Sequence, residues 1–274
     1  MQATLMGAKA FTFTGGGEPL VNPDTIPALI EAKKRWLQGD FGFITNGLVL
    51  DNSSMMAILK NCVWVRISLD ASDAEMYKET HGMPEKSFER VLRNIDKLVN
   101  LKKEMKSKCT IGVGYLTRTS TLRGMESFTE TMKGLGVDYV QFRPFHGDST
   151  QITEQFQKCQ DFATSSFSVL CSSHKYEKIA QGWARPYDVC YGHSFAGVIG
   201  ADAEVYLCCH MRGMSEFSFG NLREQSLEEI WNSDKRKKVI QSIDLTKCPP
   251  MCRCDTFNEL LWEIRKPQEH VNFL

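Results

Sequence analysis

The chain has 274 residues, of which 42% are hydrophobic and 24% are charged, and its formal net charge is +0. A chain of this length can bury one large core or two smaller ones, so a globular protein is expected. The neutral balance excludes an electrostatic footprint for nucleic acid or for an anionic membrane. No apolar run reaches membrane-spanning length, and the residues after Met1 do not form a signal peptide. We therefore expect a cytoplasmic protein without nucleic-acid or membrane partners.

The first half of the chain alternates predicted strands with predicted helices. The expected strands are 10–14, 41–44, 63–69, 110–116 and 137–142, and the expected helices are 24–37, 51–60, 87–106 and 121–133. Such alternation predicts parallel βαβ units, and polar residues follow several strand ends, as in barrel enzymes. No G-x-G-x-x-G opens a helix, which argues against a doubly wound nucleotide fold. The fold class indicated is α/β, with a partial parallel (β/α) TIM-like barrel.

The alternation ends near Gln151 in this interpretation. Residues 151–170 are expected to be mostly helical, 195–200 and 204–207 to be two strands joined by a turn, and Ser226–Glu229 to open a helix as a capping box. A last amphipathic helix is expected to carry Phe257, Leu260, Leu261 and Ile264 on its apolar side. The predicted domains are a partial barrel at 1–150, a helical bridge at 151–189 and a small α+β domain at 190–274.

The first candidate site is the segment Gly15-Gly-Gly-Glu18-Pro19, directly after the first predicted strand. Glycines allow close approach of the backbone to a ligand and positive φ angles. Glu18 adds an acceptor suited to an ammonium group, and Pro19 fixes the exit of the loop. A tight turn before a helix would explain the same residues. A phosphate loop, by contrast, offers N–H donors and lacks this glutamate.

Two further strand ends carry polar side chains, namely Thr45-Asn46-Gly47 and Ser68-Leu-Asp70. Such hydroxyl, amide and carboxylate groups can hydrogen-bond a ribose and an aminocarboxylate. Turn and cap roles explain the same residues without any ligand.

Ten cysteines, without a secretory signal, indicate thiols, metal ligands or small buried hydrophobes rather than disulfides. Four of them are isolated in apolar or helical segments and are expected to be structural: Cys62, Cys109, Cys159 and Cys171. The other six crowd the last third of the chain. A hairpin can bring Cys190 close to Cys208, and the spacing of Cys248 and Cys252 can place two thiolates on one centre. Four thiolates suit zinc or an iron–sulfur cluster, and ligand softness does not choose between them.

The strand-end segments resemble the core of radical S-adenosylmethionine (SAM) enzymes. Gly15–Pro19 is similar to their GGEP motif, Thr45–Gly47 to their TNG turn and Ser68–Asp70 to their S-x-D strand end. Tyr77–Gly82 is similar to the helix that follows that strand, and Gln141–Pro144 to the sixth strand. The resemblance implies that these residues bind SAM: Gly15, Gly16, Gly17, Glu18, Pro19, Thr45, Asn46, Ser68, Asp70 and Arg143. Among them, Glu18 and the glycines would receive the methionine amino group.

The cysteine-rich part resembles the SPASM/twitch extension of the same enzymes, in a short form with one auxiliary [4Fe-4S] cluster. The resemblance implies Cys190, Cys208, Cys248 and Cys252 as ligands, with Cys209 and Cys254 as alternates. His193 and His210 are more often surface or satisfied histidines than ligands. Zinc remains the alternative metal.

The sequence differs from the family in one respect, because no CxxxCxxC motif occurs in it. In the family these three cysteines hold the cluster that cleaves SAM. We expect a truncated barrel that lacks its first strand; a partner chain that supplies the segment, or a natural remnant, are the other readings. The function implied is hydrogen-atom abstraction from a peptide or small molecule, with an electron donor; no catalytic residue is assigned, and the chain alone is expected to be inactive. The alternative is a non-catalytic zinc- or iron–sulfur-binding interaction module.

Overall fold

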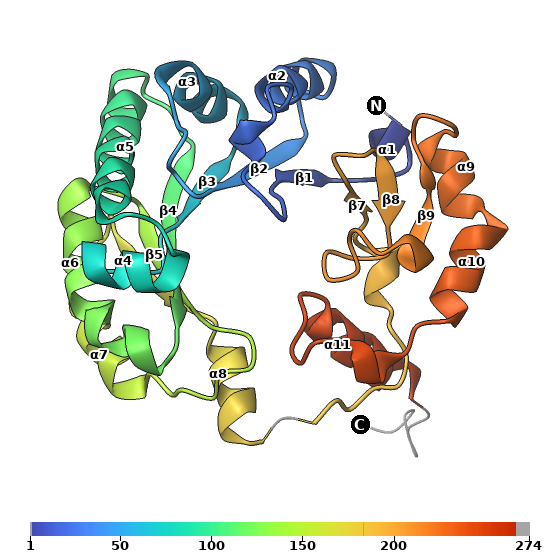
Figure 1. Cartoon of the computed structure of the whole chain (residues 1–274). Coiled ribbons are helices and arrows are strands. Elements are labelled where there is room, and N and C mark those ends of the chain that lie inside the picture. Colours follow the sequence, from blue (N-terminus) through green and yellow to red (C-terminus); the bar gives the residue numbers. More distant parts are fainter. Residues whose placement is uncertain (1, 183, 267–274) are drawn as a thin grey trace. The chain divides into compact units, whose positions relative to one another are not determined.

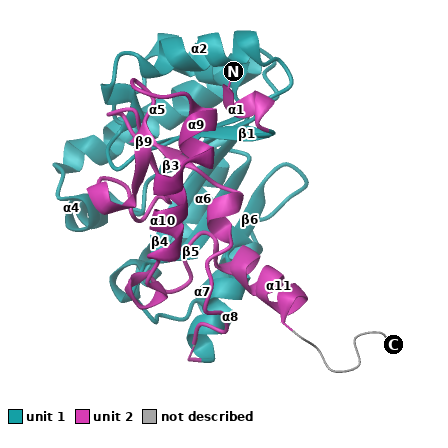
Figure 2. Ribbon diagram, turned by 90° about the vertical axis from the view of Figure 1, so that its right-hand side faces the viewer, with its two compact units in different colours: residues 1, 7–181 teal, residues 2–6, 182–274 magenta. Residues whose placement is uncertain are grey.

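The computed structural model describes residues 2–182 and 184–266, which form two compact units (Figures 1 and 2). Unit 1 comprises residues 7–181. Unit 2 comprises residues 2–6 and the chain from residue 182 onward. Met1, Trp183 and residues 267–274 lie outside the described residues, so the end of the predicted 190–274 domain is not covered.

Unit 1 is built on a six-stranded sheet in which every strand pairs in parallel with its neighbour in sequence. This order, with a helix between most successive strands, is that of a (β/α) barrel. The strands are β1 (Ala10–Phe13), β2 (Asp40–Thr45), β3 (Trp64–Ser68), β4 (Thr110–Thr117), β5 (Tyr139–Pro144) and β6 (Ser168–Cys171).

Helices cover one face of this sheet, as the left part of Figure 1 shows. The core between them is apolar and includes Phe43, Val65, Ile111 and Phe142, all with 0% of their surface exposed. The helices are α2 (Thr25–Arg35), α3 (Asn52–Asn61), α4 (Ala74–His81), α5 (Glu85–Glu104), α6 (Met125–Leu135), α7 (Thr153–Gln160) and α8 (Ser173–Ala180), with short 3-10 turns at Pro19–Val21 and Thr119–Gly124.

The sixth strand is the main correction to the sequence analysis. Residues 168–170 were expected to belong to a mostly helical segment, but Ser168–Cys171 form β6 and pair with β5. The chain turns back at Thr164, whose N–H donates to the carbonyl of Phe167. That turn breaks the helical pattern after α7, and Val169 then points into the core. The segment predicted as a helical bridge therefore contributes to the sheet.

Two glycines leave room for aromatic rings on the sheet face opposite the helices. A Cβ atom on Gly42 of β2 would lie 2.2 Å from Cζ2 of Trp64, its neighbour on β3. One on Gly112 of β4 would lie 2.0 Å from Cζ of Tyr139 on β5. Each glycine lets the neighbouring ring lie flat across the strand.

Unit 2 contains a three-stranded antiparallel sheet with its own small core around Val205, Phe219 and Ile230. The expected hairpin is present, although its first strand is shorter than 195–200, and the third strand was not expected. Its elements are α1 (Gln2–Leu5), β7 (Val198–Ile199), β8 (Glu204–Tyr206), β9 (Ser218–Asn221), α9 (Leu227–Asn232), α10 (Asp234–Gln241) and α11 (Asp255–Arg265), with 3-10 turns at Gly192–Ser194, Ser215–Phe217 and Leu245–Lys247.

The last helix, α11, does not bury the side that its sequence pattern indicates. Its buried residues are Asp255 and Asn258. Phe257, Leu260 and Ile264 are 51%, 59% and 69% exposed. The fully buried side chains of this helix are therefore polar, whereas most of its apolar stripe is exposed in the described part of unit 2. Leu261 is half-buried, and the ring of Phe257 stacks on that of Phe195.

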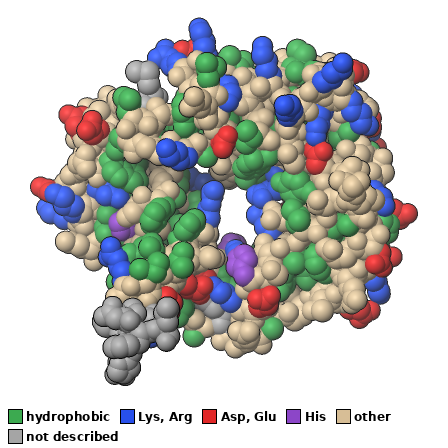
Figure 3. Space-filling view, turned by 180° about the vertical axis from the view of Figure 1, so that it is seen from behind, with side chains coloured by type: hydrophobic (Ala, Val, Ile, Leu, Met, Phe, Trp, Pro, Cys, Tyr) green, Lys and Arg blue, Asp and Glu red, His purple; other side chains and the backbone are tan. Residues whose placement is uncertain are grey.

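The surface agrees with the neutral composition. Basic and acidic side chains are interspersed on the face shown in Figure 3. No described helix is long and apolar enough to cross a membrane.

Candidate functional site

Glu18 joins the glycine-rich loop to the turn after β2. Its Oε1 accepts hydrogen bonds from the Leu20 N–H at 3.1 Å and from the Thr45 hydroxyl at 2.8 Å. Its Oε2 accepts from the Asn46 N–H at 2.6 Å. A carboxylate has about four acceptor positions, so these three bonds leave about one for a further donor. The structure thus brings three of the predicted residues, Glu18, Thr45 and Asn46, into one group.

The glycines of this loop do not behave as their sequence suggested. None of Gly15, Gly16 and Gly17 is among the described glycines with positive φ. Gly15 is needed for space instead, because a Cβ there would lie 3.2 Å from the carbonyl oxygen of Gly17. Pro19 opens the short 3-10 turn that Glu18 caps. The loop is shaped by close backbone approach and by its capping carboxylate.

The turn after β2 contains a glycine in the left-handed backbone conformation. Gly47 has a φ of 78°, and its carbonyl accepts from Nδ2 of Asn94 on α5 at 2.7 Å. Asn94 was missed by the sequence analysis. The available signal was a polar residue on the buried side of an otherwise apolar helical stripe.

Asp70 belongs to a different contact. It has a φ of 49°, and its carboxylate accepts from the Leu116 N–H at 2.7 Å. Burial raises the pKa of Asp70, while the Leu116 N–H and the nearby His81, Arg143 and Arg66 oppose that rise. Ser68 pairs with Gly114 at the end of β3. Within the described chain, no hydrogen bond links Ser68 or Asp70 to the Glu18 group.

Arg143 lies beside a second arginine that was not predicted. A Cβ atom on Gly114 would be 3.4 Å from a terminal nitrogen of Arg143 and 3.5 Å from Cδ of Arg66. Arg66 donates to Oε1 of Gln141 at 2.9 Å. The two guanidinium-bearing side chains therefore cross the bare strand position at Gly114. Both guanidinium groups act on the carboxylate of Asp70, since each opposes the rise of its pKa.

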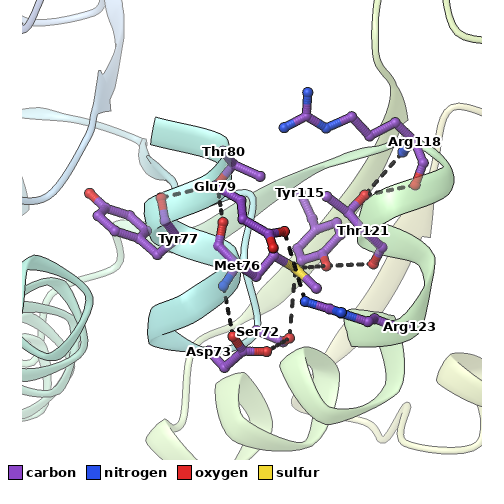
Figure 4. Close-up of polar contacts among 10 residues, drawn as sticks. All are labelled: Ser72, Asp73, Met76, Tyr77, Glu79, Thr80, Tyr115, Arg118, Thr121 and Arg123. Carbon is purple, nitrogen blue, oxygen red and sulfur yellow. Dashed lines mark hydrogen bonds and ion pairs between the residues drawn. The ribbon is translucent and has the colours of Figure 1, made fainter. Parts of the chain in front are cut away.

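The segment after Asp70 is fixed by polar contacts around α4 (Figure 4). Asp73 caps the helix by accepting from the Met76 N–H at 2.8 Å. The buried Tyr115 hydroxyl donates to the Thr121 carbonyl at 2.8 Å and lies 3.1 Å from the Met76 sulfur. These contacts fix the position of α4 relative to β4 and to the turn that follows it.

The last six cysteines all lie in unit 2, and their thiols are close enough to influence one another. Burial raises the pKa of Cys248 to about 11, and Cys208, Cys252 and Cys190 add to that rise. Burial also raises the pKa of Cys254 to about 12, with Cys252, Cys190 and Cys208 adding to it. The thiols of Cys190, Cys208 and Cys252 therefore influence the pKa of both Cys248 and Cys254, and the assignment of individual ligands stays a prediction.

These thiols do not form a site for one metal ion. Among the described residues, no group of three or more His, Cys, Asp or Glu side chains could hold a single ion. Thiolates are ligands of both zinc and iron–sulfur clusters, so the donor set by itself suits either metal centre. Burial raises the pKa of Cys208, and the N–H groups of Met211 and His210 oppose that rise.

Two family models match the chain, one over the segment that contains the Glu18 group and one over the segment that contains the last six cysteines. The radical SAM superfamily model matches residues 2–119, and the SPASM model, an iron–sulfur cluster-binding domain, matches residues 190–255. The chain thus contains segments that match the radical SAM superfamily and the SPASM domain, which confirms the predicted resemblance. These two matches imply SAM and iron–sulfur clusters as cofactors.

Individual proteins support the same assignment. A probable GTP 3',8-cyclase of Methanococcus aeolicus is 27% identical over 158 residues, which are 53% of this chain and 50% of that protein. Streptococcus suis SuiB bound to S-adenosylmethionine superposes with a TM-score of 0.64 at 13% identity, over 88% of this chain and 58% of that one; SuiB has also been solved with its precursor peptide SuiA. For anSMEcpe with bound AdoMet the TM-score is 0.56 at 18% identity, over 88% and 68% of the two chains.

These structural neighbours confirm the predicted fold class, a TIM-like parallel barrel followed by a small α+β domain. The chain spans about half the length of the curated relative and of SuiB. The residues present fit both cofactors by their chemistry: Glu18 keeps an acceptor position for an ammonium group, and the six cysteines of unit 2 offer thiolates, which suit an iron–sulfur cluster.

Proposed function

We propose that this chain provides the SAM-binding barrel and the auxiliary cluster of a radical SAM/SPASM enzyme that abstracts a hydrogen atom from a peptide or small molecule. The observation that carries the proposal is the Glu18 group, which joins the glycine-rich loop and the TNG turn through hydrogen bonds of 2.6 to 3.1 Å. Both segments are implied by the resemblance to bind SAM.

The binding roles follow from the donors and acceptors at the strand ends. The remaining acceptor position of Glu18 receives the methionine ammonium. Asn46 Oδ1 accepts from the Leu48 N–H at 2.9 Å, so its amide presents Nδ2, a donor for a carboxylate or ribose oxygen. Ser68 and Asp70 bind from the next strand end, and Arg143 lies near the adenine or the substrate.

The chemistry supplied by the bound cofactors is one-electron cleavage of SAM followed by hydrogen-atom abstraction. Residues 1–274 contain no CxxxCxxC motif. We therefore propose that residues outside this sequence hold the cluster that starts the reaction, with an external one-electron donor. In unit 2, Cys190, Cys208, Cys248 and Cys252 hold the auxiliary cluster, with Cys209 and Cys254 as alternates.

The similar proteins act on two different kinds of molecule. SuiB has been solved with a precursor peptide, whereas the curated relative is named as a nucleotide cyclase. The positive charge of Arg66 and Arg143 on one sheet face favours a substrate with a carboxylate or phosphate group.

The proposal is tested by titrating SAM into the full chain under anaerobic conditions, with calorimetric detection. In Glu18→Gln, an NH₂ group replaces one carboxylate oxygen. If the remaining oxygen accepts from Leu20 and Thr45, the new NH₂ group faces the Asn46 N–H, and two donors then oppose each other. We expect SAM affinity to fall at least about tenfold, as for loss of a charge-assisted hydrogen bond. Glu31→Gln, at an exposed helix position, is the matched control.

Thr45→Val separates binding from turn stability. It removes the hydroxyl that donates to Glu18 and accepts from the Gly47 N–H, but it keeps the carboxylate. Its melting temperature should fall, and its SAM affinity should fall less than that of Glu18→Gln. Unchanged affinity in Glu18→Gln would remove Glu18 from the SAM site. Zinc instead of iron in the purified chain, with no SAM binding, would favour the non-catalytic module.

A further inference from the structure

Asn258 holds the loop that carries Cys190. This side chain lies on α11 and is 1% exposed. Its Oδ1 accepts from the Tyr191 N–H at 2.7 Å and from the Gly192 N–H at 2.8 Å. Two buried N–H groups next to a predicted cluster ligand are thus satisfied by one amide oxygen.

These two bonds also fix which way the amide faces. The oxygen must point toward the two N–H donors, because an NH₂ group there would face them without an acceptor. The Nδ2 group is therefore directed to the other side, where it lies 3.9 Å from the sulfur of Cys190. Sulfur accepts hydrogen bonds at longer distances than oxygen does, so this contact is an N–H···S bond.

A second pair strengthens the same junction. The Tyr187 hydroxyl donates to Oδ1 of Asp255 at 2.7 Å. Asp255 is only 3% exposed. Gly192 also packs closely on Cys254, since a Cβ there would lie 2.3 Å from the Cys254 Cβ. The Cys190 loop is therefore clamped to the start of α11, directly after Cys252 and Cys254.

We propose that Asn258 is a positioning residue of the auxiliary cluster: it sets the place of the Cys190 thiolate and donates a hydrogen bond to its sulfur. This inference rests on the proposed function. Hydrogen bonds to ligand sulfurs stabilise the more negatively charged, reduced cluster and raise its reduction potential. Asn258 thereby favours acceptance of an electron.

The test compares Asn258→Asp and Asn258→Leu with the wild-type full chain, each reconstituted anaerobically with ferrous iron and sulfide. Asp keeps the acceptor for both backbone N–H groups but lacks the donor, and Leu lacks the donor without adding charge. At the wild-type midpoint potential, we expect the ratio of reduced to oxidised cluster in Asn258→Asp to fall about tenfold, equivalent to 59 mV for one electron. The ratio should also fall in Asn258→Leu.

The control is Asn232→Asp, which changes an amide on an exposed surface of unit 2. This variant should keep the wild-type ratio. The measurement is iron content together with an electron paramagnetic resonance titration.

A wild-type ratio in both Asn258 variants would overturn the proposal. Loss of iron from Asn258→Asp would overturn it as well, because that variant keeps the two bonds that hold the loop. If the wild-type chain itself loads no iron, the proposed function fails first, and this inference fails with it.

Discussion

Helices α5 and α11 both carry an apolar stripe in their sequences, yet they pack with opposite faces. The long α5 buries its stripe in the core of unit 1: Phe88, Val91, Ile95, Leu98 and Val99. The shorter α11 leaves most of its stripe exposed and buries Asp255 and Asn258 in unit 2. An apolar pattern by itself therefore did not determine which face of a helix is buried.

This difference in packing separates a contribution to stability from a contribution to geometry. Apolar burial contributes free energy in proportion to area and has no preferred direction. Hydrogen bonds are directional, so the bonds of Asp255 and Asn258 fix the rotation of α11 relative to the Cys190 loop. We infer that α5 contributes mainly stability, whereas α11 contributes mainly geometry near the cysteines.

The largest effect on stability is expected in α5. Leu98 is 0% exposed, and Leu98→Ala should lower the free energy of unfolding by about 2 to 5 kcal/mol because it leaves a cavity. Urea unfolding of unit 1, followed by far-UV circular dichroism, measures the loss. The neighbouring exposed Lys97→Ala is the control. A loss below about 0.5 kcal/mol, typical of surface positions, would contradict the role given to α5.

A smaller effect is expected where α11 meets the Cys190 loop. In Gly192→Ala the new methyl group would collide with Cys254, which should cost about 1 to 3 kcal/mol through forced displacement. Thermal unfolding and thiol accessibility would report the change. Gly134→Ala on α6 meets nothing within 4 Å and should instead stabilise by about 0.5 to 1 kcal/mol. Equal behaviour of the two variants would refute the close packing at Gly192.

The smallest effect is expected on the exposed stripe of α11. Leu260 is 59% exposed, so Leu260→Ala should change the free energy of unfolding by no more than about 0.5 kcal/mol. The same urea experiment applies. A loss of 2 kcal/mol or more, the cost typical of a core leucine, would show that this stripe is buried in solution and would remove the contrast with α5.

Much of the barrel was predictable from local pattern. The β-branched run at β3 and the stripe of α5 specify their elements through side-chain periodicity. β6 was missed because it is short and follows a helix after one turn at Thr164–Phe167. β9 was missed because its sequence, Ser218–Asn221, has little strand character and depends on pairing with β8.

The candidate site was predictable in its residue types but not in its connections. The motifs pointed to Glu18, Thr45 and Asn46, yet only the fold shows that the carboxylate binds the other two. Arg66 and Asn258 lie in no recognised motif, because their roles arise from contacts across 75 and 66 to 68 residues of sequence. The SAM and thiolate assignments of individual residues stay predictions.

The two glycine–aromatic pairs of the barrel sheet, Gly42 with Trp64 and Gly112 with Tyr139, limit how the sequence can diverge. A side chain at Gly42 would occupy the place of the Trp64 ring, and one at Gly112 that of the Tyr139 ring. Neither glycine can be replaced alone without moving its partner, and loss of the ring alone would uncover the strand. Relatives of this chain should therefore exchange each pair jointly, a larger residue on one strand appearing together with a smaller one on the next.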